Sequence, residues 1–104
     1  MKQVPLRKMN VTIQDKSVPF GYADLFVSAL NDPGKQGFTI DDVRQRVPLV
    51  AKLQKAEDEV LLEEAEYKLL VGVMRDFRFA VITPAIIQMI DELEGAATVE
   101  VKPA

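Results

Sequence analysis

Apolar residues recur at helical spacing over residues 63–76, the longest such run in the chain. Tyr67, Leu70, Val71 and Met74 stand three or four positions apart, so an α-helix places them on one stripe. A stripe of this kind is buried against another element in a folded protein. Glutamates lead the segment, where negative charge favours the positive end of the helix dipole. We therefore predict an amphipathic helix here, with the rest of the fold packed around it.

The N-terminal region has the alternation of a strand. Apolar residues occupy every second position over 9–13, which predicts a strand with one face on a core. A turn over 15–17 follows, and 18–20 is either a short returning strand or extended chain. A second extended segment, 60–62, is predicted to pair with the strand at 9–13.

Two further helices are predicted from their start and stop signals. Residues 22–30 have an apolar helical face and end at a proline–glycine turn. The last helix begins after Thr83, an N-cap residue, has Pro84 at its first position and ends at Gly95. Its predicted buried face consists of Ile86, Ile87, Ile90 and Leu93.

Pro48 leaves two interpretations of the region after Thr39. Thr39 and Asp42 match the capping box that opens a helix. A proline inside a helix removes one hydrogen bond and clashes with the preceding turn. Either one kinked helix continues through it, or a helical turn over 40–46 is followed by a new helix with Pro48 in its first turn. We favour the second, because proline costs nothing at that position. The apolar stripe of the second helix is then Leu49, Leu53 and Ala56.

Composition narrows the class of protein. With 104 residues, 48% of them hydrophobic, the chain forms one domain with a sizeable core. Cysteine and histidine are absent, which removes disulfides, thiolate zinc sites and the two side chains that most often act in catalysis near neutral pH. The net charge of −3 argues against nucleic acid as a partner, because nucleic-acid binders carry a basic excess. No apolar run reaches the ~20 residues needed to cross a bilayer.

These patterns together predict an α+β domain that is mostly helical, with four or five short helices packed on a small N-terminal β-strand or hairpin. The domain spans 1–95, and 96–104 form a flexible C-terminal tail or a stray edge strand. The first residues do not resemble a secretory leader, so we expect a cytoplasmic location. We expect no catalytic residue, no metal site and no cofactor.

Two motifs suggest a binding function, but each also has a simpler structural interpretation. The loop after Pro33 contains glycines and a lysine, but it lacks the Ser or Thr and the strand–loop–helix context of a phosphate loop. We predict a plain turn. The segment 75–82 alternates basic and aromatic residues, as RNA-recognition strands do, but only Arg75, Phe77 and Phe79 fit that motif. We favour core or oligomer contacts for both phenylalanines.

Charged residues form two groups. Arg44, Lys52 and Lys55 fall near one face if the 40–57 region is one helix, and such a basic strip is usually solvated. Carboxylates gather around residue 60, and we favour a solubilising role over metal binding for them. They form the predicted acidic surface: Glu57, Asp58, Glu59, Glu63, Glu64 and Glu66.

The order of the elements resembles that of a group of short phage and prophage proteins. The resemblance covers residues 4–94. It rests on residue class and spacing in a short N-terminal strand followed by DLFVSAL, RVPLVAKLQKAEDEVLLEEAEYKLLVGVM and TPAIIQMIDEL. Pro48 departs from the pattern. The group carries no catalytic signature, so the resemblance implies a small phage-encoded accessory protein that works through protein contacts.

We expect a non-enzymatic interaction protein, either an accessory of head or tail assembly in the virion or a homo-oligomeric component. Residues 77–90 supply more large apolar side chains than one helix face needs, and such a surplus marks a contact surface. The expected contact residues are Phe77, Phe79, Ile87 and Met89. One alternative is a regulator or inhibitor that binds host transcription or defence machinery through the acidic surface. A second alternative is direct nucleic-acid binding through the basic–aromatic segment.

Overall fold

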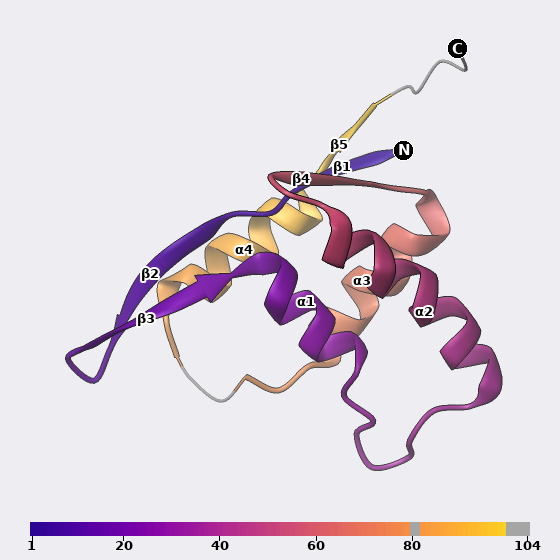
Figure 1. The fold of residues 1–104 in the computed structure, drawn as a ribbon, viewed down its shortest axis with the longest axis horizontal. Coiled ribbons are helices and arrows are strands. Elements are labelled where there is room, and N and C mark those ends of the chain that lie inside the picture. Colours follow the sequence, from indigo (N-terminus) through magenta and orange to yellow (C-terminus); the bar gives the residue numbers. More distant parts are fainter. Residues whose placement is uncertain (80–81, 100–104) are drawn as a thin grey trace.

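The computed structural model describes residues 1–79 and 82–99 and has an α+β fold, as predicted (Figure 1). Within these residues there are four helices and five strands. The strands form two small sheets, so the predicted single N-terminal hairpin underestimates the β structure. The elements in chain order are β1 Lys2–Pro5, β2 Lys8–Ile13, β3 Lys16–Gly21, α1 Tyr22–Leu30, α2 Ile40–Lys55, β4 Glu59–Leu62, α3 Glu64–Asp76, α4 Pro84–Glu94 and β5 Ala97–Thr98.

The three-stranded sheet has β1 at its centre, with β4 and β5 antiparallel on its two sides. Val4 of β1 lies opposite Val60 of β4, and both are buried, as is Leu62. The predicted pairing of 60–62 with 9–13 is therefore wrong. The physical reason is burial, because β4 needs a partner strand inside the core and the apolar face of β2 is only half-buried.

The second sheet is the hairpin β2–β3, which extends away from the helices (Figure 1). Ile13 lies opposite Lys16, so two residues, Gln14 and Asp15, form the turn. Both have positive φ angles, 50° and 63°, as a type I′ hairpin turn requires. The returning strand is thus present, and the turn begins one residue before the predicted 15–17.

The core lies between the three-stranded sheet and the helices. α3 matches the predicted central helix over 63–76, and its Leu70 and Met74 are fully buried. The other elements add mainly leucine and aromatic side chains, which supply the large apolar area that a small domain must bury. These other fully buried residues are Val4, Tyr22, Phe26, Leu30, Leu49, Leu53, Leu62, Met89 and Leu93.

α2 runs without a break through Pro48. The favoured prediction of two helices is therefore wrong, although the cap is confirmed: the Thr39 hydroxyl accepts a hydrogen bond from the Asp42 N–H at 3.1 Å. A proline inside a helix costs about 3 kcal/mol. Burial of one leucine side chain contributes about 1.5–3 kcal/mol, and α2 buries both Leu49 and Leu53. Packing of these two residues against the core thus outweighs the local cost of the proline.

α4 begins and ends where predicted, with Thr83 as N-cap, Pro84 at its start and Gly95 as C-cap. Its inward face differs from the predicted one. Ile87 is 66% exposed, and Ile86 is only half-buried. The buried residues of α4 are Ala85, Met89 and Leu93.

The segment after α4 returns to the sheet. Lys2 lies opposite Thr98, and the Val99 N–H donates a hydrogen bond to the Met1 carbonyl at 2.7 Å. Residues 97–98 thus form an edge strand, which is one of the two predictions for this segment. The rest of the predicted tail, 100–104, lies outside the described residues.

We expect Pro48→Ala to raise the free energy of unfolding by about 2 kcal/mol. Alanine restores the N–H that can bond the Arg44 carbonyl and removes the ring clash, while the loss of proline's rigidity in the unfolded chain offsets part of the gain. Urea unfolding measures the change. Pro84→Ala is the matched control and should alter stability little, because the first helical position needs no N–H donor. An unchanged or lower stability of Pro48→Ala would contradict this account of α2.

Candidate interaction surface

The predicted contact residues separate into three environments. Phe77 and Phe79 pack edge to face with their ring centroids 5.1 Å apart, and both are half-buried against the core. Met89 is fully buried, so it reaches a partner only if the core rearranges. Ile87 is the one member of the set with most of its side chain exposed. The four residues therefore do not form one exposed surface.

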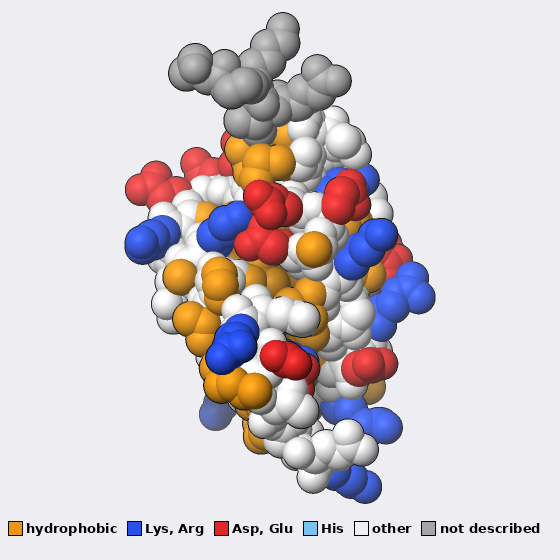
Figure 2. Space-filling model, turned by 90° about the vertical axis from the view of Figure 1, so that its right-hand side faces the viewer, with side chains coloured by type: hydrophobic (Ala, Val, Ile, Leu, Met, Phe, Trp, Pro, Cys, Tyr) orange, Lys and Arg blue, Asp and Glu red, His pale blue; other side chains and the backbone are white. Residues whose placement is uncertain are grey.

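A different set of apolar side chains is exposed together on α2 and the residues just before it. Ile40 is 64% exposed, Val43 40% and Val47 61%, and Phe38 in the preceding loop is 37% exposed. The three helical residues are spaced by three and four positions, so they lie on one face of α2. We call these four residues the α2 stripe. Figure 2 looks onto the side of the molecule that carries α2 and shows hydrophobic side chains interspersed with charged groups on this face.

A shallow groove of about 260 Å³ lies beside the α2 stripe. Its walls come from α2, from the C-terminal end of α1 and from Phe38, and most of the wall is apolar. Grooves with such walls next to exposed apolar side chains are typical of surfaces that receive side chains of another polypeptide. The lining residues are Leu30, Asn31, Phe38, Val43, Arg46, Val47, Val50, Ala51 and Gln54.

Arg46 fixes the position of Phe38 at the edge of this groove. Its Nη1 donates a hydrogen bond to the Leu30 carbonyl at 3.0 Å, and its Cζ lies 4.8 Å from the centroid of the Phe38 ring. The last turn of α1 has no basic residue of its own, so Arg46 supplies positive charge at the negative end of that helix. The cation–π contact then holds the ring over α2. Arg46 Nε is buried with no hydrogen-bond partner among the described residues.

The predicted charged groups are partly neutralised inside the fold. Lys52 pairs with Glu66 at 2.6 Å, which removes the middle of the predicted basic strip. Glu66 also accepts a hydrogen bond from the Glu63 N–H at the start of α3, and the Glu59 carboxylate accepts one from the Gln3 side chain. Two of the acidic residues thus have structural contacts. Within 1–79 and 82–99, no group of three carboxylates is arranged to hold a metal ion.

In its described residues, 75–79 and 82, the basic–aromatic segment does not form the strand that base stacking requires. Phe77 is the C-cap residue of α3, and Arg75 Nε pairs with the Glu94 carboxylate at 2.9 Å. The Phe77 ring faces the Phe79 ring and the core, so neither ring is free for a base. Residues 80–81 of the segment lie outside the described residues.

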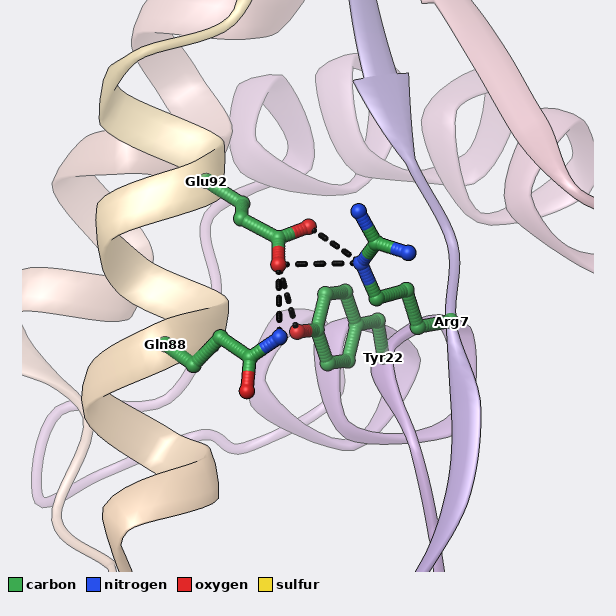
Figure 3. A network of polar contacts seen from close by, with 4 residues as sticks. All are labelled: Arg7, Tyr22, Gln88 and Glu92. Atoms are coloured by element: carbon green, nitrogen blue, oxygen red, sulfur yellow. Dashed lines mark hydrogen bonds and ion pairs between the residues drawn. The ribbon is translucent and has the colours of Figure 1, made fainter.

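A polar network joins the β1–β2 connection, α1 and α4 (Figure 3). Arg7 Nε donates to both Glu92 carboxylate oxygens, at 2.9 and 2.7 Å. Gln88 Nε2 donates to Glu92 Oε1 at 2.9 Å, and the Tyr22 hydroxyl donates to it at 3.3 Å. This cluster could not be predicted from the sequence, because Arg7 and Tyr22 lie 85 and 70 positions away from Glu92 along the chain.

The network keeps Glu92 ionised. Partial burial raises the pKa of the Glu92 carboxyl, but hydrogen bonds from Gln88 and Arg7, the charge of Arg7 and the hydrogen bond from Tyr22 outweigh it, so the pKa lies below its usual value. Burial and the neighbouring carboxylate raise the pKa of the Tyr22 hydroxyl, which therefore remains a donor. A carboxylate with this many donors is held in place as an acceptor, so we assign the network the role of tying α4 to the N-terminal half of the chain.

A second, more open hollow of about 410 Å³ lies between α3 and the loop that joins α1 to α2. Two acids, Asp32 and Asp76, and two bases, Arg46 and Lys68, are among its lining residues. Opposite charges in equal number favour neither an anion nor a cation. The loop itself consists of turns, with Gly34 and Gly37 at positive φ angles of 59° and 72°.

Comparison of the chain with models of known protein families, with curated proteins and with solved structures finds no match. The role of the α2 stripe must therefore be inferred from the exposure and chemistry of its own residues. None of the helices in the described part of the chain is long and apolar enough to cross a membrane.

We expect the free energy of unfolding to fall as the pH drops below 4.5, the ordinary value for the Glu92 carboxyl. The pKa of the Glu92 carboxyl is lower in the folded state than in the unfolded state. Its charged form therefore stabilises the folded state at pH values above the unfolded-state pKa. This stabilisation is lost as the pH falls through the folded-state pKa. Glu92→Gln keeps the side-chain shape but does not titrate. Urea unfolding at about pH 6 and about pH 3 should therefore show a smaller acid dependence in this variant than in the natural chain.

Glu57→Gln is the control for this experiment, because it removes an exposed carboxylate outside the network. Its acid dependence should match that of the natural chain. Equal acid dependence in Glu92→Gln and the natural chain would show that the network does not hold Glu92 in its charged form.

Proposed function

We propose that this chain is a protein-interaction module whose contact surface is the α2 stripe and its groove. The observation that carries the proposal is that α2 has two apolar faces. Leu49 and Leu53 bury one face in the core, while Ile40, Val43 and Val47 expose a second apolar face. A helix of a monomeric domain normally has one apolar stripe, so a second one indicates a second partner.

The exposure of neighbouring apolar side chains in the α2 stripe supports this proposal. Single exposed apolar residues are common and need no explanation, but a contiguous patch of them is characteristic of a contact surface. Ile40 and Val47 each expose more than half of their side-chain area. Removing this remaining area from water contributes about 1 kcal/mol per side chain. The Arg46 contacts that hold Phe38 in place also reduce the entropy lost when a partner binds.

We further propose that the partner belongs to the assembly of a phage particle or is another copy of the chain. The support for a phage context is the resemblance of residues 4–94 to short phage and prophage proteins, which is a resemblance of pattern. The chain has neither cysteine nor histidine, and this composition fits a role through binding. We make no separate proposal for the acidic surface, because Glu66 and Glu59 already have partners within the fold.

We expect Val47→Lys to abolish partner binding without unfolding the protein. The side chain is 61% exposed, so the ammonium group remains solvated in the isolated chain but would be buried in a complex. Affinity purification of the tagged chain from cells that carry its gene, followed by mass spectrometry, identifies the bound polypeptides. Ile87→Lys is the matched control, because Ile87 is 66% exposed on α4 and lies outside the stripe.

The stripe is the contact surface if a polypeptide bound in stoichiometric amount by the natural chain is lost in Val47→Lys and kept in Ile87→Lys. Loss only in Ile87→Lys would instead place the contact on α4, where the sequence analysis expected it. Identical bound polypeptides in all three preparations would refute the proposal.

A further inference from the structure

We infer that the α2 stripe binds a second copy of this chain, with the two α2 helices packed antiparallel across a twofold axis near Val47. This inference rests on the proposed function and specifies the partner. In a contact with twofold symmetry, the same surface patch of each copy forms the interface. The residues of the patch must therefore fit against the same residues of the other copy, rotated by 180°. The small apolar residues around Val47 and one pair of opposite charges at the ends of α2 meet this requirement.

The apolar residues nearest to Val47 on this face of α2 are arranged symmetrically about it. Four positions before it stands Val43, and four positions after it stands Ala51. Seven positions away, Ile40 on one side corresponds to Gln54 on the other, whose side chain has an aliphatic stem. An α-helix completes about two turns in seven residues, so these five residues share one face. Antiparallel packing therefore places Val47 against Val47 and Val43 against Ala51 of the second copy.

The charges at the two ends of α2 are complementary in the same arrangement. Asp41 lies near the N-terminal end and Lys55 at the C-terminal end, and both are exposed. They are 14 positions apart in the chain, close to four turns at about 3.6 residues per turn, so they lie on the same flank of the stripe. Antiparallel packing brings Asp41 of each copy beside Lys55 of the other. Parallel packing brings like charges together.

Two further features favour the antiparallel arrangement. The dipoles of antiparallel helices oppose one another, so the positive end of each lies near the negative end of the other. The groove beside the stripe runs from Phe38 and Val43 to Gln54. In the antiparallel pair, the Phe38 end of one groove meets the end of the other that is formed by Ala51 and Gln54, so the ring can pack against the Ala51 methyl group and the aliphatic stem of Gln54.

The first experiment measures the mass of the natural chain in solution by size-exclusion chromatography with light scattering over a concentration series. The chain has a mass of 11.6 kDa, and we expect twice this value at the higher concentrations. Val47→Lys should remain monomeric, because it places two ammonium groups together at the twofold axis. Ile87→Lys should dimerise like the natural chain. A monomeric natural chain, or a dimer that persists in Val47→Lys, overturns the inference.

The second experiment tests the orientation with charge reversal. Asp41→Lys and Lys55→Glu each convert both end contacts into like-charge pairs, and each should raise the dimer dissociation constant about tenfold at low salt. The double variant Asp41→Lys/Lys55→Glu should dimerise like the natural chain, because it restores both opposite-charge pairs. An equal mixture of the two single variants should form a heterodimer for the same reason. Unchanged dimerisation in the single variants, or no recovery in the double variant, overturns the antiparallel arrangement.

The two proposals fail in different ways. If the natural chain is monomeric but binds another polypeptide that Val47→Lys loses, the second copy is excluded and the interaction function stands. If Val47→Lys changes neither the mass nor the bound polypeptides, both proposals fail.

Discussion

Burial around the central strand β1 is the constraint on which the fold depends. β1 has only four residues, yet it pairs with β4 on one side and β5 on the other. Val4 within it and Leu6 just after it are 1% and 3% exposed, so this short segment supplies both hydrogen-bonding edges and core side chains. A strand this short is stable only when its neighbours bury it. The helices provide that burial, and their positions follow from it.

The elements whose signals are local were predictable from the sequence. α3 has the apolar period of a helix, Thr39 and Thr83 mark helix starts, and Gly95 marks an end. These signals depend on residues within a few positions of one another. The role of β1 was not predictable in this way, because its partners come from 59–62 and 97–98 and only the whole fold brings them together.

The candidate surface was missed for a single physical reason. Dividing the region into a turn over 40–46 and a new helix that begins near Pro48 places Val43 on the first segment, Ala51 on the second and Val47 at the junction, so no continuous stripe can be recognised. The structure keeps one helix, because burial of Leu49 and Leu53 overrides the local preference of proline. Of the contact residues that the sequence did suggest, Ile87 alone is largely exposed. Spacing predicts which residues share a face, but not which of two apolar faces the core will occupy.

The distal half of the hairpin β2–β3 lies apart from the core cluster of this small protein. Only the base of the hairpin, at Met9 and Phe20, packs against the core cluster, whereas the turn at Gln14 and Asp15 is exposed. An isolated two-stranded ribbon is marginally stable in water, so the distal half opens at a small free-energy cost while β1 remains intact. Its amide hydrogens will therefore exchange with solvent long before those of the central sheet.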